Sequence, residues 1–195
     1  NPINFKHINI KKNEPINNNF FNSDAKMLIS IGRLDKYKNH VDIIEVFKKI
    51  YKNYNIRLAI FGDGPEENNL KKIIKLNNLQ KFIQIFKFND NPYKYLQNSN
   101  LFISTSLFEG FPNSMLEAIC MGIPCISYNC KSGPSEMFEN EKFGTLVDLN
   151  DKNQLMNKIT NFLDEEQIKS DYSKLKDKYN ISTITQNYAS LINYD

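Results

Sequence analysis

The residues of this 195-residue chain best suited to chemistry are two cations in one short loop. Arg33 and Lys38 lie in the segment Gly-Arg-Leu-Asp-Lys-Tyr-Lys-Asn, and the 25 basic residues of the chain include only two arginines. Because lysine is the default cation of this sequence, an arginine in a loop indicates a chemical requirement. A planar guanidinium and a flexible ammonium together suit the oxygens of a diphosphate. The alternative for both side chains is solvated surface charge.

Two carboxylates flank a second segment, Glu-Gly-Phe-Pro-Asn-Ser-Met-Leu-Glu at 109–117. Glu109 ends a loop, and Glu117 lies about one turn into the helix predicted to follow Asn113. The first turn of a helix presents backbone N–H groups that favour an anion such as phosphate, and the carboxylates suit sugar hydroxyl groups. Two alternatives stay open: Ser114 and Glu117 have the spacing of a capping box, and Glu109 could be a solvated or capping carboxylate.

Short apolar runs precede these residues and predict the strands that position them. The predicted strands are 27–31, 57–61, 82–86, 101–105, 124–128 and 144–147. Amphipathic stretches at helical spacing alternate with the strands. This alternation predicts an α/β fold, a Rossmann-like parallel sheet of about six strands with helices on both faces. Ligands of such sheets bind at the carboxyl ends of the strands, where the unusual residues of this sequence stand.

Glycines mark the same predicted edge of the sheet. Five of the seven glycines follow predicted strands: Gly32, Gly62, Gly64, Gly110 and Gly133. Glycine lets backbone approach a ligand or turn with positive φ, so five at one edge favour a binding site over ordinary turns. The Gly-Asp-Gly-Pro turn is not a dinucleotide fingerprint, because Glu67 stands where the third glycine would be. A nicotinamide cofactor is not expected.

Composition argues against several classes of protein. The net charge of +3 is modest and the lysines are scattered, which disfavours a nucleic-acid partner. The three cysteines lack a Cys-x-x-Cys spacing, so we predict buried thiols in a reducing compartment and no metal site. No apolar run reaches the roughly 18 residues that span a membrane, and we expect a cytoplasmic protein. The start has no apolar signal core and no methionine, which we interpret as a piece of a longer chain.

The motifs together resemble those of family-4 glycosyltransferases with the GT-B fold. The segment 109–117 is similar to the glutamate-seven-glutamate signature of that family, and residues 32–39 are similar to its phosphate-binding loop. The segments G-D-G-P-E, M-G-I-P-C-I-S and C-K-S-G-P-S-E also resemble family motifs, and the likeness runs in order from about residue 27 to 163. The resemblance implies the C-terminal half of the fold, which binds the sugar nucleotide.

The same resemblance implies how the chain is organised. It implies an interdomain linker or arm at 1–24, a nucleotide-sugar-binding domain at 25–165, and C-terminal helices at 166–195 that return toward a missing N-terminal domain. The acceptor would bind through that missing domain, so the chain alone is expected to be inactive as a transferase. Peripheral association of the full-length protein with the inner face of the membrane is left open.

The resemblance also implies roles for individual residues. Arg33 and Lys38 would bind the diphosphate, Glu117 the ribose hydroxyls, and Glu109 the donor sugar. The base would lie near Phe86, Lys87 and Phe88, although relatives often have glycine in place of Lys87. The implied catalytic set is Glu109, Arg33 and Lys38, and the implied donor-binding set is Gly32, Phe86, Lys87, Gly110, Phe111, Asn113, Ser114 and Glu117.

The implied activity is transfer of a hexose-type sugar from a nucleoside diphosphate sugar, with a UDP-sugar favoured, to a glycan or lipid-linked acceptor. Relatives usually transfer with retention, and no separate cofactor is implied. Two alternatives remain. One is a non-catalytic nucleotide-sugar-binding module, which slow donor hydrolysis would contradict. The other is a sugar-nucleotide epimerase or a phosphorylase on a similar half-fold, and a phosphorylase would carry a pyridoxal group with visible absorbance.

Overall fold

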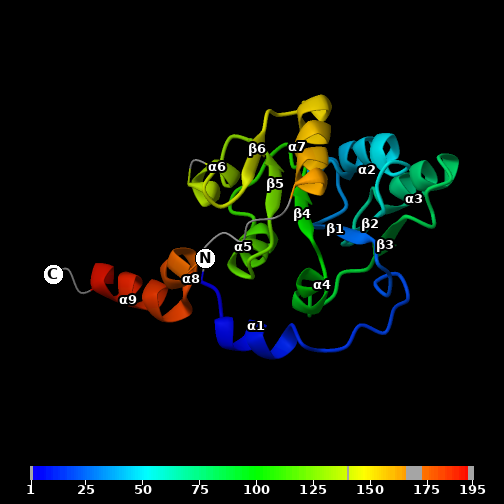
Figure 1. Ribbon diagram of the computed structural model, residues 1–195. Helices are drawn as coiled ribbons and strands as arrows, with labels where there is room; N and C mark the ends of the chain where they lie inside the picture. Colours follow the sequence, from blue (N-terminus) through cyan, green and yellow to red (C-terminus); the bar gives the residue numbers. More distant parts are fainter. Residues whose placement is uncertain (1, 140, 166–172, 193–195) are drawn as a thin grey trace.

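A computed structural model of the chain describes residues 2–139, 141–165 and 173–192 and confirms the predicted α/β fold (Figure 1). Six strands form one sheet, and each begins and ends within one residue of its predicted bounds. The strands are β1 (Lys26–Ile31), β2 (Ile56–Phe61), β3 (Ile83–Phe86), β4 (Leu101–Ser104), β5 (Cys125–Tyr128) and β6 (Thr145–Val147).

The order of the strands determines where a ligand can bind. The sheet runs β3-β2-β1-β4-β5-β6, and every neighbouring pair is parallel. The chain builds outward from β1 in one direction and from β4 in the other. The loops that follow β1 and β4 therefore diverge and open a crevice at the carboxyl edge of the sheet.

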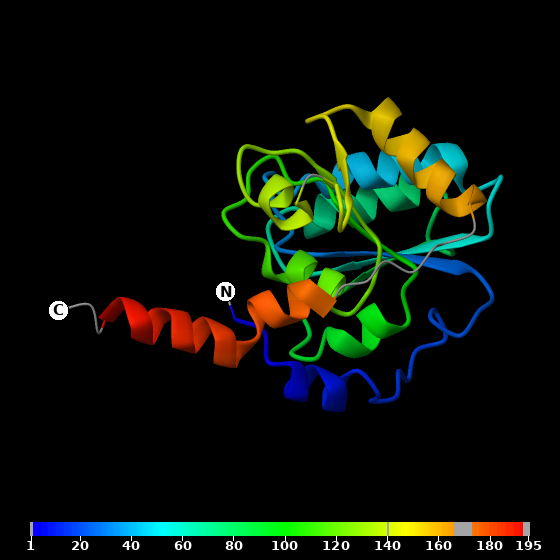
Figure 2. The ribbon, with the colours of Figure 1, turned by 60° about the vertical axis from the view of Figure 1, so that its left-hand side comes forward.

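Helices cover both faces of the sheet, as Figure 2 shows with the sheet seen nearly edge-on. One face carries α2 (His40–Ile50), α3 (Glu67–Leu76) and α7 (Lys152–Asp164). The other face carries α4 (Tyr93–Gln97), α5 (Asn113–Cys120) and α6 (Pro134–Phe138). Successive residues of β1, Leu28 and Ile29, belong to the two opposite cores and are 1% and 0% exposed. Burial on both faces explains why the strands read as nearly continuous apolar runs.

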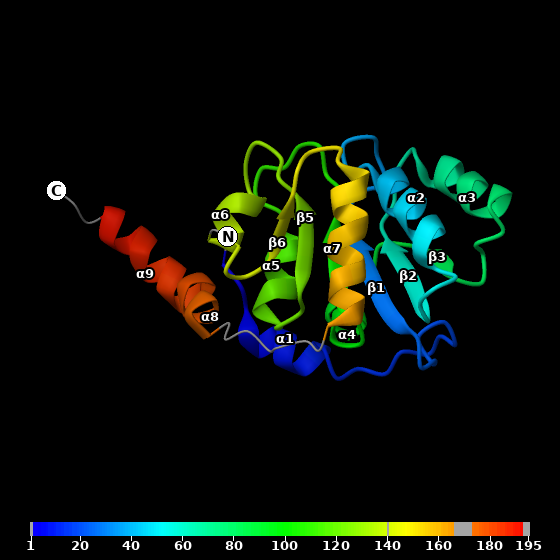
Figure 3. The ribbon, with the colours of Figure 1, turned by 45° about the horizontal axis from the view of Figure 1, so that its top comes forward.

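The start of the described chain meets the junction of the last two helices beside the second face of the sheet. The predicted arm contains a helix, α1 (Phe5–Lys11), and the tail contains α8 (Ser173–Tyr179) and α9 (Ile181–Ile192). The Ile3 N–H donates to the Tyr179 carbonyl at 2.7 Å, and the Ile181 N–H donates to the Ile3 carbonyl at 3.2 Å. Beyond this junction α9 extends away from the sheet (Figures 1 and 3). The predicted tail at 166–195 lies partly outside the described residues, and no described helix is long and apolar enough to cross a bilayer.

A buried polar network fixes the turn that follows Lys38. Asn39 adopts a left-handed conformation with φ 48°, and its side-chain amide donates to Asp42 Oδ2 at 2.8 Å. The hydroxyl of Tyr128, on β5, donates to the same oxygen at 2.8 Å. The hydroxyl of Thr105, just after β4, donates to the Asn39 carbonyl at 2.8 Å. The turn after Lys38 is thus held by residues in the loop after β1, just after β4 and at the end of β5.

We expect Tyr128→Phe to lower the free energy of unfolding by about 1.5–3 kcal/mol, because the change removes a buried hydrogen bond to a carboxylate. Tyr54→Phe is the matched control, since the Tyr54 hydroxyl also donates to an aspartate, Asp164, at 3.0 Å but at an exposed site. Its cost should stay within about 0.5 kcal/mol. Denaturant unfolding of the two variants measures both values, and equal costs would contradict a structural role for the buried network.

Candidate functional site

A cleft of about 610 Å³ opens at the carboxyl edge of the sheet. It lies between the ends of β1 and β2 on one side and the starts of α4 and α5 on the other. Its lining residues are Ile31, Gly32, Arg33, Phe61, Gly62, Asp63, Phe88, Asp90, Pro92, Tyr93, Asn113, Ser114 and Glu117. A second cavity of about 330 Å³ lies around the first residues of β4, β5 and β6. That edge holds none of the predicted site residues, so the first cleft is the candidate site.

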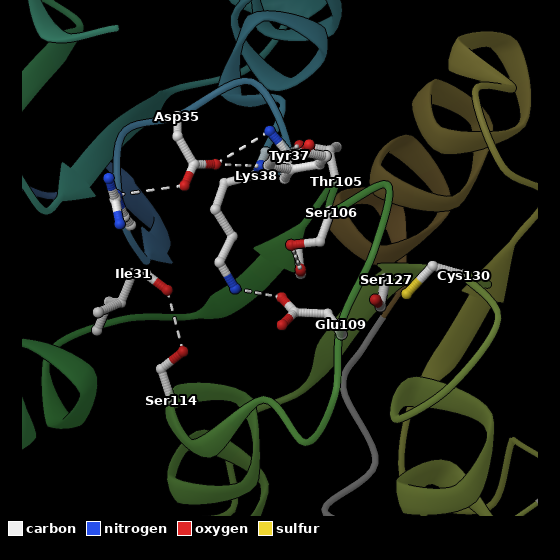
Figure 4. Close-up of polar contacts among 12 residues, drawn as sticks. Ile31, Asp35, Tyr37, Lys38, Thr105, Ser106, Glu109, Ser114, Ser127 and Cys130 are labelled. Atoms are coloured by element: carbon white, nitrogen blue, oxygen red, sulfur yellow. Dashed lines mark hydrogen bonds and ion pairs between the residues drawn. The ribbon is translucent and has the colours of Figure 1, made fainter. Parts of the chain in front are cut away.

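An ion pair joins the two diverging loops beside the cleft. Lys38 Nζ donates to Glu109 Oε1, and the two side chains are 25% and 8% exposed. Figure 4 shows the Lys38 side chain reaching from the loop after β1 to Glu109 in the loop after β4. The Lys38 methylenes also lie 3.4 Å from the position that a Cβ would take at Gly32. A nearly buried carboxylate therefore has its counter-charge beside the cleft, where a ligand phosphate could share the ammonium.

Arg33 differs from Lys38 in being exposed. Its Nε lies 3.5 Å from Asp35 Oδ2, and the Arg33 side chain is 72% exposed. The other oxygen of Asp35, Oδ1, accepts hydrogen bonds from the backbone N–H groups of Tyr37 and Lys38, each at 3.0 Å. Among the described residues, Arg33 is the only cation that lines the cleft. Its guanidinium is free to turn toward an anion at little cost in burial.

Three of the predicted glycines are required by the packing of the loops, and Gly110 is not. A Cβ at Gly62 would lie 1.9 Å from the Gly32 carbonyl oxygen, and one at Gly64 would lie 2.3 Å from the Leu34 carbonyl oxygen. Gly133 has φ +91°, and a Cβ there would lie 2.9 Å from the Gly110 carbonyl oxygen. A Cβ at Gly110 would meet nothing within 4 Å. Since no contact among the described residues requires a glycine at 110, this position fits the close approach of something else to the backbone.

Helix α5 begins at the cleft without the predicted capping box. Pro112 is the N-cap and makes no side-chain cap bond, so Ser114 already lies inside the first turn. The Ser114 hydroxyl donates to the Ile31 carbonyl at 3.0 Å and ties the helix to the end of β1 (Figure 4). Asn113 and Ser114 both line the cleft. The positive end of the α5 dipole is therefore directed at this site.

Glu117 faces the cleft and is held by a tyrosine. The Tyr93 hydroxyl donates to Glu117 Oε1 at 3.0 Å. Burial raises the pKa of Glu117, and the Tyr93 hydrogen bond lowers it in part. Burial and the nearby Glu117 charge raise the pKa of Tyr93 to about 12. The carboxylate keeps acceptor capacity on both oxygens and so can accept further hydrogen bonds from a ligand in the cleft.

The three predicted residues after β3 have different surroundings. The ring of Phe86 lies in an aromatic cluster, 4.7 Å from the centre of the Phe61 ring and 5.7 Å from that of Phe21 in the arm. The Lys87 ammonium pairs with Asp63 at 3.0 Å and with Glu67 at 2.8 Å, at a largely exposed position. Only Phe88 lines the cleft, with 64% of its surface exposed and its N–H donating to Asp63 Oδ2 at 3.0 Å.

The predicted residue Phe111 and the histidine His40 lie outside the cleft lining. The Phe111 ring is 5.9 Å from that of Tyr179 on α8. His40 begins α2 and is 3% exposed, and burial lowers its pKa to about 4. Neither residue lines the cleft. Within the described ranges, no group of three or more histidine, cysteine, aspartate or glutamate side chains could hold a metal ion.

Tyr93 is one of the polar cleft residues that the sequence analysis missed, together with Asp63 and Asp90. Asn91-Pro92 has the residue types of a helix start and comes shortly after the third predicted strand, which puts the next residue at the carboxyl edge of the sheet. A tyrosine at that position could have been selected as a polar group directed at the site. What the sequence did not indicate is its partner, because Glu117 is 24 residues away on another helix.

Comparison with known proteins agrees with this geometry. The family described as glycosyl transferases group 1 matches residues 11–179. An uncharacterized glycosyltransferase of Methanocaldococcus jannaschii is 39% identical over 128 residues, which cover 64% of this chain and 32% of the relative. The N-acetylgalactosamine-N,N'-diacetylbacillosaminyl-diphospho-undecaprenol 4-alpha-N-acetylgalactosaminyltransferase of Campylobacter jejuni is 31% identical over 147 residues, which cover 75% of this chain and 40% of the relative.

Solved structures of glycosyltransferases also match the fold of this chain. The crystal structure of TarM matches with a TM-score of 0.76 and 27% identity, over 86% of this chain and 35% of TarM. A mutant of S. aureus TarM, in complex with Fondaparinux, alpha-GlcNAc-glycerol and UDP, matches with a TM-score of 0.77 and 27% identity over 87% of this chain and 36% of that one. These neighbours are GT-B glycosyltransferases, and their match confirms the predicted half-fold. The chain spans about a third to a half of the length of the curated relatives that it matches.

We expect Lys38→Ala to lower the free energy of unfolding by about 1–3 kcal/mol, because it leaves the Glu109 carboxylate nearly buried without its counter-charge. Adding Glu109→Gln should restore most of the loss, since the double variant has no unpaired charge. Arg33→Ala, at an exposed cation, should change stability by less than about 0.5 kcal/mol. Denaturant unfolding measures the cycle. Additive effects of the two substitutions would show that the ion pair contributes nothing.

Proposed function

We infer the function of this chain from its family, because the chain belongs to the glycosyl transferases of group 1. We propose that its cleft binds the nucleoside diphosphate sugar donor, with a UDP-sugar favoured. One observation carries this proposal: Arg33 and the N-terminus of α5 line the cleft at the β1–β4 crevice, the Lys38–Glu109 pair lies beside it, and the Glu117 carboxylate lines it one turn further along α5. A nucleoside diphosphate needs both, a positive site for its phosphates and an acceptor for its ribose hydroxyls.

We propose that the donor lies across the carboxyl ends of β1, β2 and β4. Its diphosphate contacts Arg33, Lys38 and the backbone N–H groups of Gly110, Phe111, Asn113 and Ser114. Its ribose hydroxyls donate to Glu117. Its base lies against the exposed ring of Phe88, near the backbone after β3. Phe88 lines the cleft and the Phe86 ring does not, so we propose that any contact of Phe86 or Lys87 with the base is made by the backbone.

We also propose that the donor sugar lies beside Glu109. Its anomeric carbon would face a further domain, one that corresponds to the part of the relatives that this chain does not match. Arg33, Lys38 and the α5 terminus stabilise the leaving diphosphate, which is the largest electrostatic demand of the reaction. Of the two histidines, His40 is buried away from the cleft and His7 belongs to the arm. We therefore propose a family-4 mechanism with retention, in which no histidine acts as a base.

The remaining parts of the proposal concern the whole protein. Because the chain spans less than half of the first relatives, we propose that the acceptor, a glycan or lipid-linked saccharide, binds to a further domain. The arm at 1–24 and the tail at 166–195 would then connect or contact that domain, and the chain alone would transfer little. Peripheral membrane association belongs to the same proposal. A non-catalytic sugar-nucleotide module, an epimerase and a phosphorylase are the competing functions.

Arg33→Ala tests the assignment of the diphosphate. We expect the affinity for UDP to fall about tenfold or more, because a charge-assisted hydrogen bond contributes roughly 1.5–3 kcal/mol, and the affinity for uridine to stay unchanged. Arg57→Ala is the matched control, since this second arginine donates to the Phe20 carbonyl at 2.7 Å, away from the cleft. Isothermal titration with UDP, GDP and ADP measures the affinities. Equal binding of UDP by both variants would remove Arg33 from the phosphate site.

Glu117→Gln tests the assignment of the ribose. A neutral amide replaces charge-assisted hydrogen bonds with weaker ones, so we expect nucleoside diphosphate binding to weaken by on the order of 1–3 kcal/mol. The Tm of the free protein should hold or rise, because the change removes a charge from a site where burial raises the carboxyl pKa. The 2′,3′-dideoxyribose analogue should bind the unchanged protein weakly and lose little more in the variant. A large fall in Tm with unchanged affinity would make Glu117 a purely structural residue.

A further inference from the structure

Tyr93 joins the arm of the chain to the carboxylate side of the cleft. Its hydroxyl donates to Glu117 Oε1 at 3.0 Å, and Tyr93 itself lines the cleft. The Tyr93 ring also contacts the ring of His7 on α1, with 5.8 Å between the ring centres and the planes at 82°. Tyr93 is therefore held by two contacts, the hydrogen bond of its hydroxyl to a carboxylate and the aromatic contact of its ring with the arm.

The arm holds helix α4 in place through a second contact. Asn91, just before α4, donates from its side-chain amide to the Lys11 carbonyl at 2.9 Å and to Glu14 Oε2 at 2.7 Å. Lys11 pairs in turn with Glu14 at 2.7 Å. Asn91 is 7% exposed, so its amide is shielded from water, while the Glu14 side chain is 39% exposed. Both ends of α1 thus contact the segment that carries Tyr93, and the position of the tyrosine hydroxyl depends on the docked arm.

The Tyr93 hydrogen bond restricts the orientation of the Glu117 carboxylate and still allows it to accept hydrogen bonds from a ligand. A carboxylate has about four acceptor positions, and Tyr93 occupies one of them on Oε1. The hydroxyl restricts rotation of the carboxylate and leaves its other acceptor positions available to a ligand in the cleft. A group held this way loses less conformational entropy when it accepts hydrogen bonds from a ligand.

We propose that Tyr93 is a positioning residue for Glu117, which it orients toward the ribose hydroxyls of the donor while the docked helix α1 holds its ring in place. This inference rests on the proposed function and adds a residue to it. It also gives the arm a role at the donor site, although α1 itself lies outside the cleft lining.

Tyr93→Phe is the test, because it removes the hydroxyl and keeps the ring against His7. At neutral pH the affinity for UDP should fall about three- to tenfold, as expected for one hydrogen bond. Tyr95→Phe is the matched control: it is the same change on the same helix, but the Tyr95 ring packs 4.5 Å from that of Phe61 and does not line the cleft. The control should bind UDP like the unchanged protein. In the Glu117→Gln background, Tyr93→Phe should cost little further affinity.

The pH dependence separates positioning from simple packing. Binding requires the ionised carboxylate, so it is present above the pKa of Glu117 and lost as the pH falls through it. The Tyr93 hydrogen bond lowers that pKa, and Tyr93→Phe should therefore move the loss of UDP binding to higher pH. The other titratable or charged groups around Glu117 are His7, Arg33, Asp63, Asp90 and Cys120. The series is repeated with His7→Phe in both proteins, which removes the titrating imidazole and keeps an aromatic ring against residue 93, and the shift between them should persist.

Each result has one meaning. If the unchanged protein binds none of UDP, GDP and ADP, the proposed function fails and the role of Tyr93 fails with it. If it binds UDP and Tyr93→Phe binds equally well at every pH, only the role of Tyr93 is overturned. A loss of affinity that is the same at every pH and in the Glu117→Gln background would mean that Tyr93 contacts the nucleotide directly. Carbon-13 NMR of the Glu117 carboxyl in the free proteins checks the pKa shift without a ligand, and an unchanged pKa overturns the proposal.

Discussion

The ion pair between Lys38 and Glu109 joins two loops that the topology of the sheet forces apart. The loops after β1 and β4 diverge because the strand order reverses there, and a crevice between them would otherwise lack a fixed width. A carboxylate that is 8% exposed needs a partner, and Lys38 supplies it across the crevice. The turn after Lys38 is in turn held by the network of Asp42 and Tyr128. The position of the Lys38 ammonium group thus depends on residues at the ends of β1, β4 and β5.

The cleft beside this pair has a cationic part and a carboxylate part, and Asp63 and Asp90 also line it. The cationic part is made by Arg33, the loop after β1 and the start of α5, where small residues and backbone amides leave room for a bulky anion. The carboxylate side is made by α4 and the second turn of α5, where burial alone would disfavour ionised Glu117 and the Tyr93 hydroxyl partly offsets that effect. This division suits a ligand that is itself divided into a diphosphate and a polar sugar ring.

The family match and this geometry support each other but do not carry the same information. The match to glycosyl transferases group 1 covers residues 11–179 and establishes the kind of protein. It does not say which contacts this chain uses. The aromatic cluster around Phe86, the pairing of Lys87 with Asp63 and Glu67, and the arm helix docked on α4 are properties of this chain's own packing. They determine which groups are left to face a nucleotide.

The sequence by itself determined the six strands to within one residue and the edge of the sheet at which the cleft opens, and five of the predicted site residues line that cleft: Gly32, Arg33, Asn113, Ser114 and Glu117. It could do so because apolar runs and helical spacing are local signals, and parallel strands necessarily share a carboxyl edge. Tertiary structure decided the partners. The spacing of Ser114 and Glu117 allowed a capping box, but Pro112 occupies the cap, and the two side chains bind Ile31 and Tyr93 instead. Such choices depend on residues distant in the chain that compete for the same polar atoms, and no local pattern encodes the outcome of that competition.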